Sequence, residues 1–286
     1  MSAIKNHSWN DFKTDLKPVW CPGCGDFGVV NSLYRALSEL GLAPHETVLI
    51  SGIGCSSRLP GYVESYGLNS LHGRALPIAT GVKLASPELT VLAVGGDGDG
   101  LAIGGNHFIH AARRNVDITY VMMDNEIYGL TKGQAAPTTP TGDTTKSTIY
   151  GNPEPAIDPC AFAIATGATW VGRGFSGDVK GTNELMKAAI RHPGFAFLNI
   201  ISPCVTWRGD DQTKEQRAKL QPVPPDHDAT DREAALRFTG SSESLIAGVL
   251  YDVCRPTLLD QMASIRTRAG GATREEMLAG FRPAVG

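Results

Sequence analysis

Four of the six cysteines in the sequence could hold a metal or take part in redox chemistry. They are Cys21 and Cys24 in Cys-Pro-Gly-Cys, Cys55 in Ser-Gly-Ile-Gly-Cys-Ser, and Cys204 in Ser-Pro-Cys-Val. One Cys-x-x-Cys pair is also typical of zinc knuckles and redox dithiols, and four thiolates suit either tetrahedral zinc or an iron-sulfur cluster. Zinc sites usually close with a second local pair, whereas Cys55 and Cys204 lie 31 and 180 residues beyond Cys24. This spread favours a cluster held between loops of one folded domain, although the spacing leaves zinc open.

A second group of residues could bind a divalent cation through oxygen. The apolar run Leu89 to Gly95 leads into Gly96-Asp97-Gly98-Asp99-Gly100, and Asn125 stands at the end of the next such run. The spacing fits one crossover helix, which would bring the two strand ends side by side. Asp97 and Asn125 could then bind Mg²⁺ with a backbone carbonyl and diphosphate oxygens, and the glycines would let phosphates approach the backbone. The pattern predicts a diphosphate cofactor bound through magnesium, and two coincidental turns are the alternative.

These residues need a fold that brings distant loops together, and the pattern of the chain predicts one. Short β-branched apolar runs alternate with segments of helical period, which indicates a parallel, doubly wound α/β sheet. The predicted strands are Thr47 to Ser51, Leu89 to Gly95, Asp117 to Asp124, Thr169 to Gly172 and Phe195 to Ser202. The predicted helices are Asp26 to Leu40, Ala75 to Ala85, Ile103 to Arg114, Pro159 to Thr166 and Asn183 to Arg191. Functional groups should collect at the carboxyl ends of the strands.

Composition narrows the class of protein further. The 286 residues are 42% hydrophobic and 19% charged, which is enough for one large domain or two small ones. The net charge of -3 and the lack of a long basic stretch argue against nucleic acid as a partner. The first twenty residues lack an apolar signal core, and no run of 18 apolar residues follows, so we expect a cytoplasmic protein with no membrane partner.

The C-terminal part differs from the rest of the chain in its charge and hydrophobic pattern. The chain is charged from Arg208 to Lys219 and then runs through Gln221-Pro-Val-Pro-Pro225 into weakly amphipathic segments without a recognisable strand. We therefore divide the chain into an α/β domain over residues 1–206 and a helical C-terminal arm over 207–286, expected to form part of a subunit interface. A small helical cap on the same core is the alternative.

The remaining cysteines and one histidine pair are given ordinary structural roles. Cys160 and Cys254 lie in apolar, helical surroundings and are expected to be small buried hydrophobic residues. His107 and His110 are one helical turn apart and belong to no recognisable motif, so we assign them to packing or to the surface.

Taken in order, the motifs resemble the beta subunit of 2-oxoacid:ferredoxin oxidoreductases, of the 2-oxoglutarate synthase type. The resemblance runs from about Lys17 to Val205, and Gly-Asp-Gly followed by Asn after a crossover is the thiamine diphosphate signature. The motifs are Cys21-Pro-Gly-Cys24-Gly-Asp, Ser51-Gly-Ile-Gly-Cys55-Ser, His72-Gly-Arg74-Ala, Asn125-Glu-Ile-Tyr-Gly-Leu-Thr-Lys-Gly-Gln134 and Ser202-Pro-Cys204. Five motifs in register are far more specific than any one of them.

The resemblance implies a role for each motif. Cys21, Cys24, Cys55 and Cys204 would hold one [4Fe-4S] cluster, and Asp97, Asn125 and the Ile127 carbonyl would hold Mg²⁺. His72 would border the thiamine, and Lys132 would face the substrate. The residues expected around thiamine diphosphate are Ser51, Gly52, Ile53, Gly54, Cys55, Ser56, His72, Gly96, Asp97, Gly98, Asp99, Asn125, Ile127, Gly129 and Leu130.

The implied reaction is oxidative decarboxylation of a 2-oxoacid, with coenzyme A accepting the acyl group, CO₂ leaving and ferredoxin taking the electrons. The Glu that activates the cofactor belongs to another chain in this family, so an alpha subunit and an (alpha-beta)₂ heterotetramer are implied. An iron-free thiamine decarboxylase or synthase would not need four thiolates. A zinc-stabilised α/β binding protein would leave Asp97, Asn125 and Lys132 without a role.

The expected substrate depends on Lys132. Family members dedicated to pyruvate tend to carry a small residue there, whereas Leu-Thr-Lys-Gly-Gln resembles the 2-oxoglutarate and broad 2-oxoacid enzymes. An ammonium group at the end of this turn could attract a substrate carboxylate, and a solvated surface Lys is the alternative. Because every 2-oxoacid has a C1 carboxylate, 2-oxoglutarate would need a second cation. We favour 2-oxoglutarate, with a pyruvate-preferring homologue as the alternative.

Overall fold

The computed structural model describes residues 7–240, 244–271 and 273–279, and its centre is one sheet of eight strands in the order β2-β1-β3-β4-β6-β5-β8-β7. The strands are β1 (Thr47–Ser51), β2 (Tyr66–Asn69), β3 (Thr90–Gly96), β4 (Ile118–Asp124), β5 (Trp170–Phe175), β6 (Phe195–Ile201), β7 (Leu220–Pro222) and β8 (Leu245–Asp252). All neighbouring strands of this sheet are parallel except the pair β5 and β8. The predicted α/β fold with a mostly parallel sheet is confirmed.

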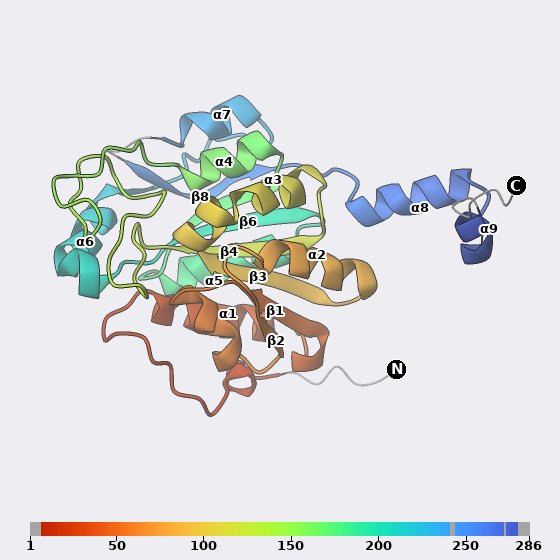
Figure 1. Cartoon of the computed structure of the whole chain (residues 1–286), viewed down its shortest axis with the longest axis horizontal. Helices are drawn as coiled ribbons and strands as arrows, with labels where there is room; N and C mark the ends of the chain where they lie inside the picture. The colour runs from red at the N-terminus through yellow and green to blue at the C-terminus, as the bar shows by residue number, and fades with distance from the viewer. Residues whose placement is uncertain (1–6, 241–243, 272, 280–286) are drawn as a thin grey trace, which may run out of the picture.

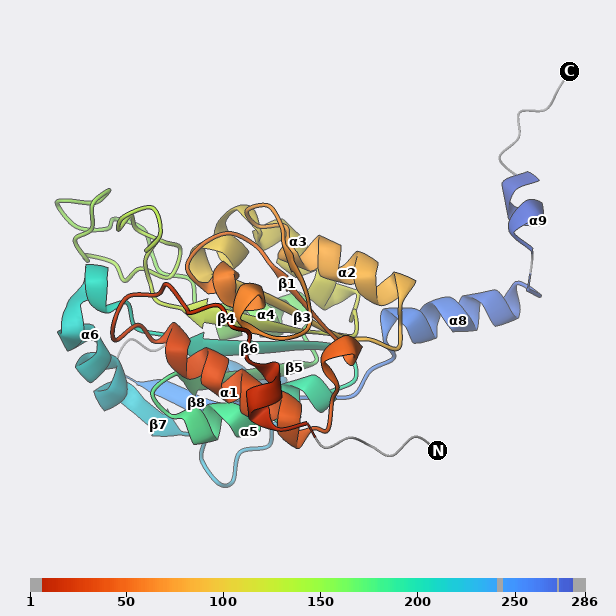
Figure 2. The same ribbon diagram turned by 90° about the horizontal axis from the view of Figure 1, so that it is seen from below.

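Helices cover both faces of the sheet (Figures 1 and 2). The α-helices are α1 (Asp26–Glu39), α2 (Ala75–Ala85), α3 (Gly105–Arg113), α4 (Pro159–Thr166), α5 (Val179–Arg191), α6 (Val205–Lys219), α7 (Arg232–Arg237), α8 (Leu258–Arg268) and α9 (Arg274–Ala279). Short helices of other types are η1 (Trp9–Phe12), η2 (Pro44–Glu46), η3 (Ser56–Tyr62) and the π-helical turn η4 (Gly98–Ile103). Helices α1 and α5 pack against one face, and α2, α3 and α4 pack against the other.

Each layer of helices seals its own hydrophobic core. Phe108 of α3 is fully buried and makes edge-to-face contacts with aromatic side chains of β4 and β6. On the other face, Leu33 and Leu37 of α1 pack with Met186 of α5. Strands β4, β5 and β6 are buried along their whole length, as expected for parallel strands covered on both sides. The cores therefore fix the positions of the strand ends.

The carboxyl ends of β1, β3, β4 and β6 lie at the same edge of the sheet. Gly96 is paired with Met123, so the loops that begin at Asp97 and Asn125 start side by side. Ile201 is paired with Asp124, which brings the loop carrying Cys204 to the same edge. This is the arrangement expected from the sequence.

The prediction that no strand follows Thr206 is wrong. Strand β8 joins the sheet antiparallel to β5, with a register shift between Val171 and Gly172, and β7 pairs with β8. Helix α7 packs against α4. Most of β8 is only partly buried, so its sequence lacks the strong pattern of the central strands. The edge strand β2 was not predicted either, because all four of its residues are exposed.

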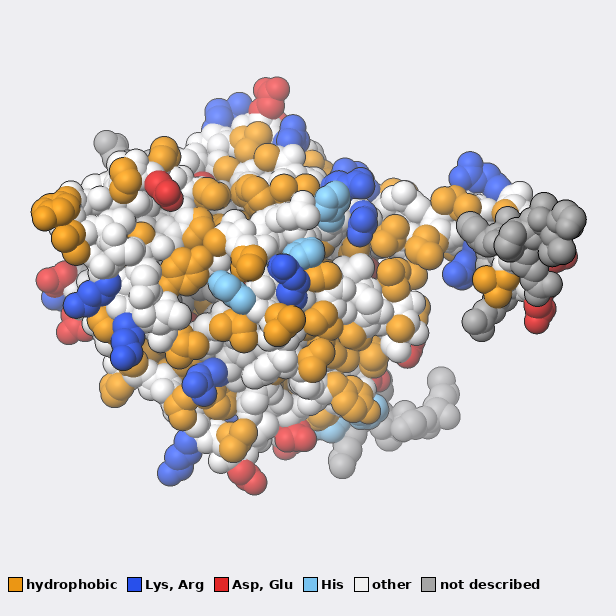
Figure 3. Space-filling view, viewed as in Figure 1, with side chains coloured by type: hydrophobic (Ala, Val, Ile, Leu, Met, Phe, Trp, Pro, Cys, Tyr) orange, Lys and Arg blue, Asp and Glu red, His pale blue; other side chains and the backbone are white. Residues whose placement is uncertain are grey.

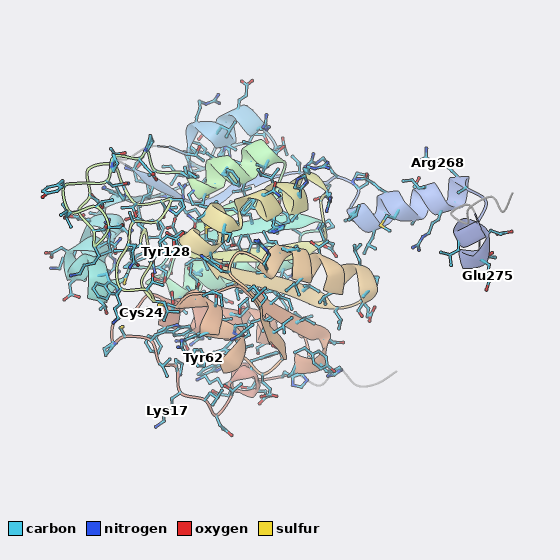
Figure 4. The ribbon with its side chains drawn as sticks, viewed as in Figure 1. Lys17, Cys24, Tyr62, Tyr128, Arg268 and Glu275 are labelled. Atoms are coloured by element: carbon cyan, nitrogen blue, oxygen red, sulfur yellow. The ribbon has the colours of Figure 1, made fainter. Side chains whose placement is uncertain are left out.

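Of the C-terminal segment 207–286 that was expected to form an arm, β7, α7 and β8 pack on the body, whereas helices α8 and α9 project from it (Figure 1). Because β8 runs antiparallel to β5 and Asp252 pairs with Trp170, the chain leaves β8 at the amino edge of the parallel strands. Figure 4 accordingly shows Arg268 and Glu275 of the arm at one end of the molecule and Cys24 and Tyr128 toward the other. None of the described helices is both long and apolar enough to span a bilayer.

Candidate active site

Three hydrogen bonds bring the predicted cysteine ligands together. The Cys24 amide donates to the Cys21 carbonyl at 3.0 Å and closes the first turn. The next amide, of Gly25, donates to the Pro203 carbonyl at 3.2 Å and links this turn to the loop that carries Cys204. The Trp20 indole donates to the Cys55 carbonyl at 2.8 Å and links the same segment to the loop after β1. The Cys-Pro-Gly-Cys segment is thus tied to both of the other cysteine loops.

The thiols also lie close to one another. A Cβ added at Gly129 would lie 3.6 Å from the Cys55 sulfur and 3.8 Å from the Cys204 sulfur, so both sulfurs lie over the same stretch of backbone. Cys21 is exposed, and the other three cysteines of the set are partly buried. All six cysteines of the chain have free thiols.

Burial and negative charge hold protons on three of these thiols, those of Cys24, Cys55 and Cys204. Burial raises the pKa of Cys55 to about 11, with a further contribution from the negative charge of Asp26. Burial, followed by the charge of Asp26, likewise raises the pKa of Cys24, and burial raises the pKa of Cys204. These three cysteines are therefore thiols in the absence of a metal, and binding a cationic metal group would release their protons. Within the described residues, no group of three or more His, Cys, Asp or Glu side chains is arranged to hold a single metal ion.

The oxygen ligands predicted for magnesium lie at the ends of β3 and β4. Asp97 is 2% exposed and accepts a hydrogen bond from the Thr138 hydroxyl. Burial raises the pKa of Asp97 to about 6, and Asp97 forms no salt bridge with any described residue. The Asn125 side-chain oxygen accepts from the Ile127 amide at 3.1 Å, and Glu126 between them has a left-handed backbone with φ of 58°. This tight turn keeps Asn125 and Ile127 within one short region of backbone, beside the strand end that carries Asp97.

Asp99 organises the neighbouring loops. One of its oxygens accepts from the Ile53 amide at 3.0 Å and from the Gly73 amide at 2.8 Å. The same oxygen lies 2.6 Å from Nδ1 of His72, whose side chain is 41% exposed, while that of Asp99 is 1% exposed. The carboxylate thus favours a proton on Nδ1 and leaves Nε2 of His72 available. Asp99 therefore positions His72 and the loop after β1.

Two glycines permit close packing at this edge. A Cβ at Gly52 would lie 1.9 Å from an Asp99 oxygen, so this loop can approach the carboxylate only without a side chain. A Cβ at Gly98 would lie 2.2 Å from the Tyr128 ring, whose hydroxyl donates to the Gly98 carbonyl at 3.1 Å. The glycines thus allow direct contact between the loops after β1, β3 and β4.

Other predicted residues surround this centre. The buried Ser51 hydroxyl donates to the Ser57 carbonyl, so it supports the turn from within. Gly54 has a left-handed φ of 132°, and Gly96 lies next to Ser56. Leu130 and Lys132 are exposed, and Lys132 adopts a left-handed φ of 79° at the end of the turn.

The structure adds two residues that sequence reasoning missed, Trp20 and Thr138. Each acts through one hydrogen bond to a residue distant in sequence, and no motif spacing indicates such a bond. Cys160 is buried, as predicted. The prediction for Cys254 is wrong, because Cys254 is exposed in the segment after β8, outside any helix.

Comparison with known proteins gives a consistent result. Residues 52–200 match the family "Thiamine pyrophosphate enzyme, C-terminal TPP binding domain". The chain is 50% identical over 200 residues to 2-oxoacid:ferredoxin oxidoreductase 2, subunit beta, of Aeropyrum pernix, a match that covers 70% of this chain and 65% of that subunit, a little under two thirds of its length. It is 36% identical over 255 residues to 2-oxoglutarate synthase subunit KorB of Methanocaldococcus jannaschii, with 86% of this chain and 92% of that subunit covered.

A solved structure agrees over nearly the whole chain. It is 2-oxoglutarate:ferredoxin oxidoreductase from Magnetococcus marinus with 2-oxoglutarate, coenzyme A and succinyl-CoA bound. The TM-score is 0.93 at 44% sequence identity, and the match covers 99% of this chain and 98% of the other. With the thiamine-binding domain, the fold and the relatives in agreement, the chain belongs to the family of 2-oxoacid:ferredoxin oxidoreductase beta subunits.

Proposed function

We propose that this chain is the thiamine diphosphate-binding beta subunit of an enzyme that converts 2-oxoglutarate and coenzyme A to an acyl-CoA and CO₂ and passes the electrons to ferredoxin. The observation that carries the proposal is the presence of an oxygen ligand set and a four-cysteine set at one edge of the sheet. A decarboxylase without iron would require only the first set, and a zinc-stabilised binding protein only the second.

Asp97, Asn125 and the Ile127 carbonyl fit a magnesium site. Asp97 is a buried carboxylate without a positive partner among the described residues, and a divalent cation would supply the missing charge. Through that ion these residues would hold the diphosphate of thiamine diphosphate. When bound, this cofactor supplies the electron sink that decarboxylation of a 2-oxoacid needs. His72, oriented by Asp99, would hold or move a proton at Nε2 beside it.

The four cysteines fit an iron-sulfur cluster better than zinc. A zinc ion needs all four sulfurs about 2.3 Å from one point, whereas each cysteine of a [4Fe-4S] cluster binds a different iron. The described side chains do not converge on one ion, and the cysteines come from three separate loops. Anaerobically purified protein should be brown and contain iron and sulfide; a colourless protein with one zinc per chain would contradict this assignment.

An alpha subunit is proposed as the partner, in an (alpha-beta)₂ assembly that transfers electrons to ferredoxin. The loops around His72 expose large apolar side chains that a partner could cover: Ile53 is 45% exposed, Leu71 74% and Leu130 47%. On the face shown in Figure 3, hydrophobic side chains mix with His, Lys and Arg, and acidic ones lie mostly toward the edges. The projecting helices α8 and α9 leave from the opposite edge of the sheet, so their truncation should impair assembly more than cluster content.

The proposed 2-oxoacid substrate depends on the position of Lys132. It is exposed at the end of the turn that begins with Asn125, and its ammonium would attract a substrate carboxylate. A charged hydrogen bond of about 1.5 to 3 kcal/mol corresponds to a loss of about tenfold to a hundredfold in kcat/KM for Lys132→Ala. Lys180→Ala, on α5, is the matched control and should leave kcat/KM unchanged.

The deciding experiment is a steady-state assay of the chain coexpressed with its alpha subunit. Ferredoxin reduction should require both coenzyme A and a 2-oxoacid, and kcat/KM should be higher for 2-oxoglutarate than for pyruvate. Preference for pyruvate would contradict the substrate, and activity of the isolated chain would contradict the need for a partner. No ferredoxin reduction by the assembled complex would contradict the proposed reaction itself.

A further inference from the structure

The proposed magnesium site and the proposed cluster site approach each other at Gly129, in the turn after β4. A Cβ added there would lie 3.6 Å from the Cys55 sulfur, 3.8 Å from the Cys204 sulfur and 3.9 Å from the side-chain nitrogen of Asn125. Groups from both sites thus lie within 4 Å of one point. A residue that bonds to both sites could therefore make the occupation of one site affect the other.

Gln212 of α6 forms hydrogen bonds with both sites. Its side-chain oxygen accepts from the Cys204 amide at 3.2 Å, and its side-chain nitrogen donates to the Glu126 carboxylate at 3.0 Å. The same nitrogen lies 3.4 Å from the Asn125 carbonyl oxygen. A backbone N–H can only donate and a carboxylate can only accept, so these partners fix the orientation of the Gln212 amide. Gln212 is 5% exposed, so little water can compete for these bonds.

A bend in α6 brings Gln212 back to Cys204. Gly209 has a φ of 77° and a ψ of 171°, which are not helical values and divide α6 into two parts. A straight helix rises about 1.5 Å per residue, so residues eight positions apart would be about 12 Å apart, too far for this hydrogen bond. A left-handed φ favours glycine, which therefore permits the link between the two sites.

The other end of the link is a turn that is held from several sides. Glu126 follows the proposed ligand Asn125 and has a left-handed φ of 58°. Its carbonyl accepts from the Thr139 hydroxyl at 2.6 Å, and its carboxylate pairs with Arg208 at 2.9 Å. The turn therefore moves as a unit, and its degree of order is passed directly to the amide of Gln212.

We propose that Gln212 is a positioning residue that couples the binding of Mg²⁺-thiamine diphosphate to the stability of the iron-sulfur cluster. When the cofactor orders the turn at Asn125, one end of the Gln212 amide is fixed, and the other end holds the Cys204 loop at a smaller cost in entropy. Each site should therefore bind its group more tightly when the other is occupied. The inference rests on the proposed function, since it requires that both groups bind this chain.

The test compares the affinity for Mg²⁺-thiamine diphosphate of the complex with its alpha subunit before and after a chelator removes the iron under anaerobic conditions. Calorimetry should show about fivefold tighter binding to the iron-containing complex, the lower end of the usual range for coupled sites. Equal affinities, with iron and cofactor both bound in the wild type, would overturn the coupling alone. A wild-type complex without iron, or without affinity for the cofactor, would overturn the proposed function as well.

Two variants test the role of Gln212. Gln212→Met keeps the length of the side chain but loses both hydrogen-bonding groups, so its two affinities should agree within about twofold. Gln212→Glu keeps an oxygen for the Cys204 amide but cannot donate to Glu126 or Asn125, so it should lose the coupling as well. This second variant keeps the test valid if Gln212→Met does not fold. A merely structural role would lower both affinities together and leave their ratio unchanged, which would overturn the inference.

Gln216→Met is the matched control. Gln216 lies one turn further along α6 with the same 5% exposure, and its side-chain oxygen has no hydrogen-bond partner among the described residues. The rate of iron release gives an independent readout: Mg²⁺-thiamine diphosphate, but not Mg²⁺ alone, should slow iron loss about fivefold in the wild type and in Gln216→Met. The same slowing in Gln212→Met would overturn the coupling through Gln212.

Discussion

The proposed oxygen site, with Asp97 and Asn125, and the proposed thiol site, with its four cysteines, lie at the same edge of the sheet. They are held there differently. Asp97 and Asn125 directly follow buried parallel strands, and the register of β3 with β4 brings them together. The cysteines lie in loops, and those loops meet through single hydrogen bonds such as Trp20 to Cys55 and Gly25 to Pro203. Strand pairing fixes the first site, whereas the second depends on a few contacts between loops.

This difference predicts which substitutions should weaken each site. The oxygen site rests on two hydrophobic cores, so only its ligands and their direct partners should be sensitive. The thiol site should also be sensitive at residues that bind no metal but hold two loops together. Four substitutions test the distinction, two at ligands and two at supporting residues.

We expect the largest effect from Asp97→Ala. Removing this carboxylate would leave the proposed magnesium without a negative protein ligand. Affinity for Mg²⁺-thiamine diphosphate should fall by at least about a hundredfold, because even outer partners of metal ligands are worth about 10- to 100-fold. Calorimetry of the purified protein measures this. Asp211→Ala, an exposed carboxylate on α6, is the control, and an unchanged affinity in Asp97→Ala would contradict the magnesium assignment.

Next in size is Cys204→Ser, which removes one thiolate from the proposed cluster. A serine hydroxyl is a poor substitute for a soft sulfur ligand, so iron and sulfide content and visible absorbance should drop sharply. Cys254→Ser changes an exposed thiol outside the cluster and should retain full iron content. Equal iron content in the two variants would show that Cys204 is not a ligand.

The parts of the fold that could be predicted from the sequence are those where burial requires a recognisable pattern of apolar residues. Central strands such as β4 are buried throughout and read as apolar runs, and the crossover between β3 and β4 has the length of one helix. The exposed strand β2 carries no such pattern, and β8 is mostly half-buried, so neither could be recognised. Strands at the edge of a sheet are paired by backbone hydrogen bonds, which the side chains record only weakly.

The same contrast holds within the site. Asp97 and Asn125 could be predicted because their order along the chain follows the order of the strands. The supporting hydrogen bonds from Trp20 and Thr138 could not be predicted. The bond from Trp20 reaches a residue 35 positions away, and the bond from Thr138 reaches one 41 positions away, each in a separate loop. The role of Asp99 was also hidden, because its carboxylate faces inward to the Ile53 and Gly73 amides.

Thr138→Val tests the support of the oxygen site. Valine keeps the shape of threonine but loses the hydroxyl that donates to Asp97, so the carboxylate is less firmly oriented. Affinity for Mg²⁺-thiamine diphosphate should fall about tenfold, the lower end of the range for partners of metal ligands. Thr141→Val is the matched control, because its hydroxyl donates to the Glu154 carbonyl on the exposed part of the same loop. A loss as large as that in Asp97→Ala would mean that the oxygen site also depends on its loops.

Trp20→Phe should have the smallest effect and is the sharpest test of the thiol site. Trp20 packs edge to face with Phe27 and Tyr62, and phenylalanine preserves an aromatic ring there while removing the hydrogen bond to Cys55. One such bond contributes about 1 kcal/mol, which corresponds to about a fivefold change in an equilibrium or rate. Iron should therefore be lost to a chelator about fivefold faster under anaerobic conditions, with initial iron content and Mg²⁺-thiamine diphosphate affinity unchanged.

In Trp9→Phe, where the ring lies near Lys13 and outside the cysteine loops, iron loss should match the wild type. If Trp20→Phe lost iron no faster than this control, the cysteine loops would be held by the cluster and the sheet rather than by the bond between them.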